Sequence, residues 1–507
     1  MSRPRVEPLS SFSRSAPPSR SLGLVAIAPA FIAYATYVLN HFYRYGATLI
    51  DAGLLAGVAW HSSPGLPEGP VYGGVSFYAY HVSPLMTLLS ALSWLVPLST
   101  AQWFALFTGL AQSLLAAAVF WLLWAEYDLK RGWRAIAAVA LSVLFSFNGL
   151  ALAQVRYPHF EIMLAASLIL FLAAWRTRQW VLAAIFFALC LICREDAGFH
   201  VFAILAVVTV LNRLDGLALR AQKPALTFMV LGFAYSVGAL VVGHLLFPQQ
   251  SSFMRVYVGD PPFAHLNPSL LSMRLRGLVV YRAYLFLPAV CAAVWAILAR
   301  NPYIAAGYIA FIPWAVLNLL ARSELAGTLS SYYAFPFLVA MFWPLIGWRM
   351  KAPPAGTPAF APYLGFSAMI LVSFVALSVQ HNPNHEPLWP ALVTPPSLAA
   401  QIKIDRAIDA IAADDRRLGR LLASDSVVAL KPDAFRRDET FLVPETGRQD
   451  TVVYFAGDRN DRAALAIVAA SRLRRTYVIS GTPLRIATDV GCSTLPTLGP
   501  LLAVARN

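Results

Sequence analysis

Long apolar segments separated by short polar connections make up most of this chain. Several of these segments approach the roughly 20 residues that a helix needs to cross a bilayer. A transmembrane barrel would instead show short segments of alternating polarity. The pattern predicts eleven membrane-spanning helices, at residues 22–42, 103–125, 135–153, 160–175, 180–194, 197–212, 226–247, 278–299, 303–321, 334–349 and 360–380.

The apolar stretch 84–98 is predicted not to cross the membrane, because it is short and contains Pro84 and Pro97. It would lie in the interface or dip into the bilayer. With this count every short basic connection falls on the side of the N-terminus. The positive-inside rule then makes that side cytoplasmic. The basic connections are residues 130–134, 176–178, 212–223, Arg300 and 348–351.

The two ends of the chain differ from this apolar middle. Residues 1–21 are polar and rich in Arg, Pro and Ser, which predicts a disordered cytoplasmic segment. Residues 22–380 form the predicted transmembrane domain, with a long external loop at 43–102. From 381 to 507, amphipathic and alternating segments predict a small α/β domain outside the cytoplasm.

Composition supports an integral membrane protein. Only 13% of residues are charged and 58% are hydrophobic, whereas soluble domains carry about 25% charged residues. The net charge of +14 is interpreted as the topology signal of a membrane protein, and no nucleic-acid partner is expected. Cys190 and Cys193 form a C-x-x-C inside a predicted span, where they are expected to pack as small apolar side chains.

Asp51 is the first candidate site residue. It is the only acid between Glu7 and Glu68, and it lies just beyond the first span. A carboxylate there is costly unless it is solvated, paired or used. A general base, a metal ligand and an N-cap for the following helix are all open interpretations. His81, before the non-crossing stretch, is a solvated interfacial histidine or a hydrogen-bond donor to phosphate or sugar.

Two external connections concentrate charge at the membrane boundary. Residues 154–161 read Q-V-R-Y-P-H-F-E and contain Arg156, His159 and Glu161. Residues 194–200 read R-E-D-A-G-F-H, between two short spans. Ionisable groups at this depth often face the protein interior and mark function. A helix cap by the two acids, or an internal salt bridge, are the alternatives.

The second of these connections contains three adjacent charged residues that are candidates for the site. Its candidates are Arg194, Glu195 and Asp196. External arginines at 255, 274, 276 and 282 run against the positive-inside trend, which predicts an anionic partner such as a phosphate or a lipid headgroup. Tyr332 lies in another external loop, where an aromatic belt is expected in any case.

Dedicated metal-site motifs are absent from the sequence. It contains no H-E-x-x-H, no zinc cysteine pair and no nucleophile elbow. The sequence therefore identifies no cofactor. A divalent metal held by Asp51, Glu195 or Asp196 is compatible with the residues but has no motif to support it.

Five short blocks together resemble the domain-of-unknown-function 2079 family of predicted bacterial membrane proteins. In chain order they are I-D-A-G-L-L-A-G-V-A-W, H-V-S-P-L, Y-P-H-F-E, C-R-E-D-A-G and S-Y-Y-A-F-P-F. That family is similar to the GT-C glycosyltransferases, polytopic enzymes that take sugars from polyprenyl-phosphate carriers on the outer face of the membrane. Ile50 and Tyr332 depart from the pattern, which has an aromatic residue and a histidine at these positions.

The resemblance implies a GT-C-like fold in the bacterial inner membrane and a polyprenyl-phosphate sugar donor. Asp51 would be the general base, with Glu195 and Asp196 orienting the site or sharing that role. Substrate contacts are expected from His81, Arg156, His159, Glu161, Arg194, Arg255 and Tyr332. A transporter or flippase of a lipid-linked or anionic solute is the main alternative, and a non-enzymatic assembly factor is a third.

Overall fold

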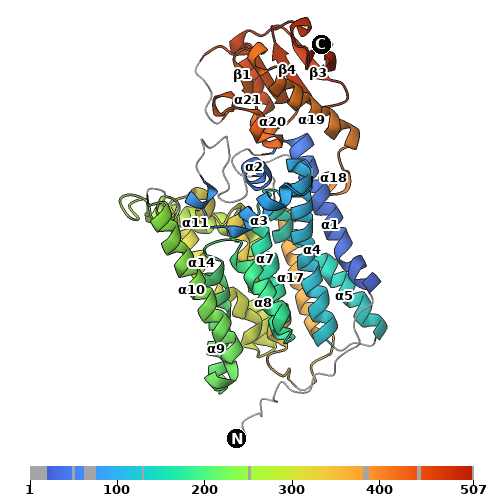
Figure 1. Ribbon diagram of the computed structural model, residues 1–507. Coiled ribbons are helices and arrows are strands. Elements are labelled where there is room, and N and C mark those ends of the chain that lie inside the picture. Colours follow the sequence, from blue (N-terminus) through green and yellow to red (C-terminus); the bar gives the residue numbers. More distant parts are fainter. Residues whose placement is uncertain are drawn as a thin grey trace.

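A helical bundle carries a small domain of mixed helices and strands at one of its ends (Figure 1). The computed structural model describes residues 20–47, 52–61, 76–96, 98–127, 131–248, 253–354, 356–380, 388–441, 447–458 and 460–504. The predicted N-terminal segment 1–21 and Asp51 fall outside these ranges, apart from residues 20 and 21. The predicted class, a polytopic helical protein with a small α/β domain, is confirmed.

The helices of the bundle are α1 (Arg20–Asn40), α2 (Leu54–His61), α3 (Pro84–Ser93), α4 (Thr100–Glu126), α5 (Arg131–Ser146), α6 (Gly149–Val155), α7 (Ile162–Arg176), α8 (Trp180–Leu191), α9 (Ala197–Leu214), α10 (Lys223–Leu246), α11 (Pro268–Tyr281), α12 (Ala283–Leu298), α13 (Ala306–Ala310), α14 (Ile312–Leu319), α15 (Glu324–Gly327), α16 (Pro336–Trp348) and α17 (Ala361–Ser378). Short helical turns join some of them: η1 (His41–Tyr45), η4 (Phe77–Ala79), η6 (Met254–Val258), η7 (Pro302–Ala305) and η8 (Ser331–Ala334).

Six helical segments in the described ranges are long and apolar enough to cross a membrane, or nine if each bent pair of helices is one span. Helices α7 and α8 lie at two further predicted spans, but they are only 15 and 12 residues long, so the count of eleven passes stays a prediction. Helix α3 has ten residues, too few for a crossing of about 20, and so fits the prediction for 84–98.

Two predicted spans are broken in the structure. Helices α5 and α6 meet at 43°, because the Asn148 side chain accepts hydrogen bonds from the backbone N–H groups of Leu150 and Ala151 and starts a new helix. Helices α11 and α12 meet at 81° around Arg282, whose guanidinium donates to the Thr328 carbonyl. Such tertiary contacts are invisible to a hydropathy pattern.

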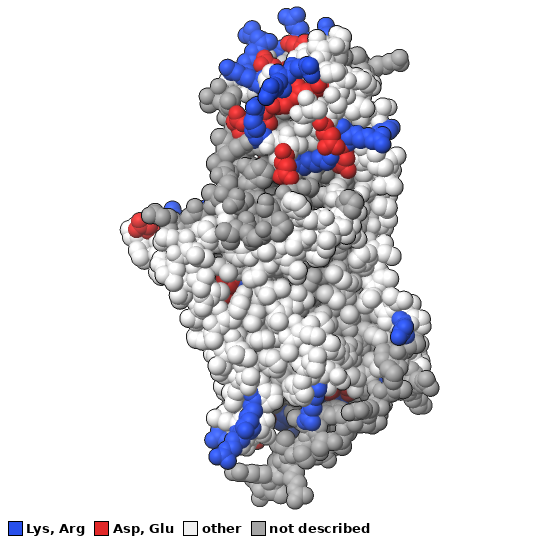
Figure 2. Space-filling view, viewed as in Figure 1, with Lys and Arg blue, Asp and Glu red and all other residues white. Residues whose placement is uncertain are grey.

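Polar contacts define a lower end of the bundle, which contains Glu126, Gly132 and the connections 176–180, 214–223, 299–302 and 349–354. Here Arg176 forms an ion pair with Glu126 at 2.8 Å, and Asn301 donates to the Gly347 carbonyl. The described residues of each predicted basic connection lie at this end, and Figure 2 shows Lys and Arg gathered there below a nearly uncharged face. The single-sided placement of basic loops thus agrees with the predicted topology.

The opposite, upper end contains α2, α3 and the connections 156–161 and 194–196, and it carries the C-terminal domain (Figure 1). That domain has a five-stranded sheet in the order β1-β2-β4-β3-β5. Strands β1 and β2 are parallel and the other pairs are antiparallel. Its elements are α18 (Leu388–Val393), α19 (Leu398–Ala413), β1 (Leu421–Ala423), α20 (Asp425–Leu430), η10 (Pro432–Ala434), β2 (Thr451–Phe455), α21 (Asp461–Ser471), β3 (Thr476–Ile479), β4 (Leu484–Thr488) and β5 (Leu502–Val504).

The C-terminal domain docks directly on the segments that flank Asp51 in sequence. The Tyr43 hydroxyl donates to both carboxylate oxygens of Asp405 at 3.1 Å. On α2, a Cβ added to Gly57 would lie 2.7 Å from Cγ of Pro432, so only glycine lets α2 approach η10 this closely. The domain is therefore packed against the start of the predicted external loop.

Glycine also permits the close contact of α9 with α10 beside the second charged connection. A Cβ at Gly198 would lie 1.8 Å from the Gly232 carbonyl oxygen, which is backbone and cannot move aside. We expect Gly198→Ala to destabilise the protein by about 1–3 kcal/mol through overpacking. Gly238→Ala, on α10 with nothing within 4 Å, should be neutral or stabilising. Thermal melting in detergent compares the two, and equal melting temperatures would contradict the packing argument.

Candidate functional site

A buried arginine surrounded by three carboxylates lies at the upper end of the bundle. Arg194 is 5% exposed. Its Nη1 lies 2.5 Å from Oε1 of Glu161, its Nε lies 3.0 Å from Oδ1 of Asp196, and the same Nε lies 3.8 Å from Oε1 of Glu195. One guanidinium thus faces three carboxyl groups away from bulk water, and burial of such groups is tolerable only when they are paired.

Each of these carboxylates also faces a histidine. Nδ1 of His81 lies 2.9 Å from Oε1 of Glu195, within hydrogen-bond distance. Nδ1 of His159 lies 3.9 Å from Glu161, and Nε2 of His200 lies 3.8 Å from Asp196. We call the arginine, the three acids and these three histidines the charged cluster.

Hydrogen bonds to the backbone hold the segment that follows His81 against the second charged connection. The Ser83 hydroxyl donates to the Cys193 carbonyl at 2.8 Å, and the Leu85 N–H donates to the Ile192 carbonyl at 2.8 Å. These bonds tie the segment before α3 to the end of α8, so that His81 reaches Glu195. Asp196 occupies the N-cap position of α9 but makes no capping hydrogen bond. It pairs with Arg194 instead, so the structure shows the predicted internal salt bridge and not the helix cap.

Ion pairing sets the protonation state of Asp196. Burial raises the pKa of this carboxyl. The guanidinium of Arg194 and the imidazole of His200 lower the pKa by more than burial raises it, so the net pKa lies below its ordinary value. The acid therefore remains an anion at neutral pH. It compensates the charge of Arg194 and is poorly suited to accept a proton.

Glu195 has a different environment, because it opens onto a hollow at the side of the bundle. Its Oε2 is buried and has no hydrogen-bond partner among the described residues. The hollow is lined by this acid and by Tyr78, Ala79, Tyr80, Val82, Ala239, Leu240, Gly243, His244, Phe247 and Phe253. It therefore combines one acid, one histidine and two tyrosines with an apolar wall.

The apolar wall of this hollow belongs to a helix that faces outward. Helix α10 exposes Val241, Leu245 and Leu246, at 52%, 73% and 64% of their surface. Such exposure suits contact with lipid tails in a membrane protein. Arg255 lies at the rim, with its guanidinium carbon 5.9 Å from the centre of the Tyr80 ring. A cation, an acid and an apolar helix face thus meet at one opening.

The connection 156–161 supplies a second recess next to the charged cluster. The ring of His159 stacks on Tyr332, with ring centres 4.2 Å apart at 22°. Burial, with the nearby His81 and Arg194, lowers the pKa of His159 well below its ordinary value, so this imidazole is neutral. Arg156 lies at the end of α6, and its buried Nε has no partner among the described residues.

The predicted candidates are thus partly brought together. His81, His159, Glu161, Arg194, Glu195 and Asp196 share one cluster, while Arg255 and Tyr332 border the adjoining recesses. Asp51 lies outside the described residues. In the part of the chain that the structure describes, no group of three or more His, Cys, Asp or Glu side chains is arranged to hold a metal ion.

Two external arginines have partners other than those predicted. The buried guanidinium of Arg274 donates to the carbonyls of Leu319 and Ala321 at 2.7 and 2.6 Å, which are unpaired acceptors at the end of α14. Arg282 donates to the Thr328 carbonyl and the Ser330 hydroxyl. For these two the structure shows neutral acceptors, three backbone carbonyls and one serine hydroxyl, where the sequence predicted an anionic partner.

Several residues of the site were not predicted. His200 joins the charged cluster, His244 lines the hollow, and Gln112 and Gln154 line the recess under Tyr332. The available signal was a polar side chain inside an otherwise apolar run, which carries a cost in a membrane and so marks a buried partner or a ligand.

Comparisons with known proteins add little to these observations. No family model matches the chain, so membership of the domain-of-unknown-function 2079 family stays a prediction. No curated protein matches it. Among solved structures it is similar to the crystal structure of ArnT from Cupriavidus metallidurans bound to undecaprenyl phosphate, with a TM-score of 0.46 and 11% identity, over 93% of this chain and 98% of that one.

Proposed function

We propose that this chain is a membrane glycosyltransferase that moves a sugar from a polyprenyl-phosphate donor to an acceptor hydroxyl. The observation that carries the proposal is the position of Glu195. This acid joins the charged cluster to a hollow that borders the outward apolar face of α10. A lipid-linked substrate needs this combination, because its tail stays in the bilayer while its headgroup reaches polar chemistry.

The hollow suits the phosphate of the donor. Arg255 at its rim and His244 in its lining are the cationic or donor groups nearest to the lipid-facing wall, and a guanidinium matches a phosphate geometrically. Arg194 is committed to three carboxylates. We therefore assign Arg194 to positioning the acids and Arg255 to the phosphate.

The reaction needs few groups. The acceptor oxygen attacks the anomeric carbon, and the bond from that carbon to the phosphate oxygen breaks. The electron pair leaves with the polyprenyl phosphate, whose charge a nearby cation stabilises. The acceptor proton goes to a carboxylate. Asp51 is the proposed base on the sequence resemblance, and Glu195, hydrogen-bonded to His81, orients the site.

The proposal places this chemistry outside the cytoplasm. The basic connections occupy the lower end of the bundle, so the positive-inside rule assigns that end to the cytoplasm. The charged cluster and the C-terminal domain would then face the periplasm or cell exterior, in the plasma membrane of a bacterium.

The test measures transfer by purified protein in liposomes, with a panel of radiolabelled polyprenyl-phosphate sugars and release of polyprenyl phosphate as the readout. Glu195→Gln should slow transfer roughly 10- to 100-fold, because a charge-assisted hydrogen bond contributes about 1.5–3 kcal/mol. Glu324→Gln is the matched control, since Glu324 is an exposed glutamate at the same end.

Two results would overturn the proposal. One is equal transfer by the Glu195 and Glu324 variants, which would remove the cluster from the reaction. The other is the absence of sugar transfer from every donor together with counterflow of an anionic solute through the same liposomes. That second result would identify a transporter.

A further inference from the structure

Four buried polar atoms without partners surround one small recess in the bundle. They are Oγ1 of Thr108, Oε1 of Gln112, and both Oε1 and Nε2 of Gln154. These side chains are 2%, 1% and 7% exposed, respectively. None of these four atoms has a hydrogen-bond partner among the described residues. Buried polar groups in native proteins are nearly always satisfied, so this concentration calls for a ligand or ordered water.

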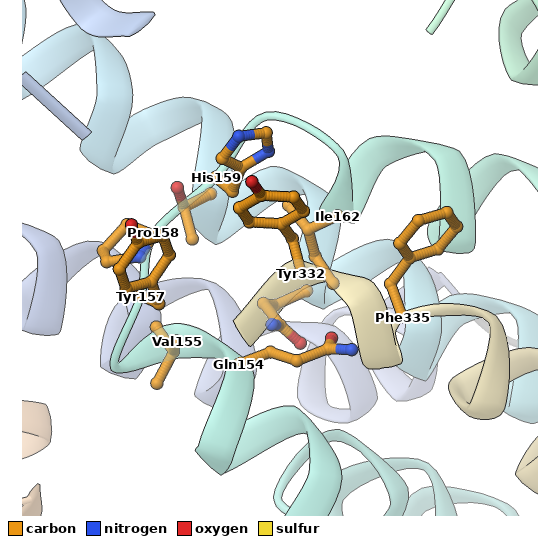
Figure 3. A pocket seen from close by; sticks show the side chains of 10 residues that line it. Gln154, Val155, Tyr157, Pro158, His159, Ile162, Tyr332 and Phe335 are labelled. Carbon is orange, nitrogen blue, oxygen red and sulfur yellow. The ribbon is translucent and has the colours of Figure 1, made fainter. Parts of the chain in front are cut away.

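The lining side chains come from several parts of the fold, among them α4, α6 and η8. Thr108 and Gln112 are one turn apart and lie on the same face of α4. Gln154 lies on α6, on the opposite side of the recess from the stacked rings of His159 and Tyr332 (Figure 3). The remaining lining residues are Val155, Tyr157, Pro158, Ile162 and Phe335.

The lining selects a neutral ligand with hydroxyl groups. It contains no Asp, Glu, Lys or Arg to match a charged ligand, and the imidazole of His159 is neutral. The amide of Gln154 supplies a donor and an acceptor, while the oxygens of Thr108 and Gln112 accept hydrogen bonds. A hydroxyl group is both a donor and an acceptor, so it satisfies this set where an anion or a cation would not.

The size of the recess limits what enters it. It has room for about one or two water molecules. A single hydroxyl or hydroxymethyl arm fits this space, whereas a complete sugar ring does not. The ring itself would lie outside the recess, where tyrosine and histidine rings at the boundary offer flat apolar faces.

We propose that this recess is a subsite that recognises one hydroxyl-bearing arm of a neutral sugar. The inference rests on the proposed function, and it assigns that function a substrate class. The subsite adjoins the charged cluster, because His159 borders the recess and also faces Glu161 of that cluster at 3.9 Å. A hydroxyl held here would fix the sugar relative to the cluster.

The experiment measures binding separately from transfer. Saturation-transfer difference NMR on the full chain in lipid nanodiscs would use methyl glycosides of neutral hexoses and pentoses, each paired with its deoxy analogues. We expect one glycoside to bind the wild type at least tenfold more tightly than the analogue that lacks the recognised hydroxyl. Gln154→Met and Gln112→Met should abolish that discrimination, because methionine keeps the side-chain length but cannot form these hydrogen bonds.

Controls separate a folding defect from a lost subsite. Gln179→Met, at an exposed position of the lower end, should bind like the wild type. The two recess variants should melt at or above the wild-type temperature, because no described residue hydrogen-bonds the buried amide oxygen that each substitution removes. A lower melting temperature with lost binding would assign these glutamines a structural role and overturn the proposal.

The remaining outcomes are also decisive. Equal binding of the glycosides and their deoxy analogues, no binding of any glycoside, or wild-type discrimination by Gln154→Met would each mean that the recess holds water only. Glycoside discrimination without transfer from any donor would retain the subsite and reject the proposed function. Sugar transfer without discrimination between a glycoside and its deoxy analogue would retain the proposed function and reject the subsite.

Discussion

Arg194→Met is expected to be the most damaging single change to the stability of this protein. The guanidinium is the common partner of Glu161, Glu195 and Asp196, at distances of 2.5–3.8 Å. Removing it leaves three buried carboxylates without their cation, and loss of one partner from a buried ion pair costs about 3–5 kcal/mol. We expect a lower melting temperature and a smaller folded fraction by size exclusion in detergent.

The reason for this loss can be tested by pH and by a second substitution. Carboxylates deprived of their cation in a buried site have raised pKa values, so the variant should regain stability relative to the wild type as the pH falls. Adding Glu161→Gln to Arg194→Met should restore part of the stability by removing one unpaired charge. Arg255→Met, at the exposed rim, is the control. An Arg194 variant that melts like this control would show that the cluster does not support the fold.

Asp51→Asn is expected to cause the largest loss of activity with little effect on folding. General-base catalysis contributes about 10²- to 10⁴-fold to rate, and asparagine preserves the shape of the side chain while removing its basicity. The transfer rate in proteoliposomes should therefore fall by that factor, with an unchanged melting temperature. Asp260→Asn, an exposed acid at the upper end, should transfer sugar like the wild type.

The same variant distinguishes the base from residues that orient the site. If Asp51 accepts the proton, its loss should lower the maximal rate more than it changes the apparent affinity for donor. Wild-type transfer by Asp51→Asn would exclude the assignment and leave Glu195 as the remaining carboxylate that opens on the hollow. A stronger effect of Glu195→Gln than of Asp51→Asn would lead to the same conclusion.

Much of the site could be predicted because its charges interrupt apolar runs. The block R-E-D-A-G-F-H stands out between α8 and α9, and the Arg156–Glu161 connection stands out in the same way. The cost of charge near a bilayer makes such interruptions informative. The pairing itself was not predictable, because His81 and Glu195 are 114 positions apart.

The recess and the arginine partners illustrate what a pattern cannot report. Gln112 and Gln154 lie in different helices, and only the packing of α4 with α6 and η8 aims them into one space. Arg274 looked like an anion ligand because its charge lies outside the predicted cytoplasmic loops. Its partners are backbone carbonyls at the end of α14. Every residue has a backbone carbonyl, so the sequence does not indicate which carbonyls accept from an arginine.

The sequence by itself determined the polytopic helical membrane class, the basic connections between the helices and the small C-terminal α/β domain. These properties follow from local quantities, namely the free energy of placing each side chain in lipid or water and the charge of each loop. The tertiary structure alone decided that one arginine serves three acids, that Glu195 opens toward α10, and that two glutamines share a recess. Each depends on distances between residues far apart in the chain, which packing sets and local composition does not.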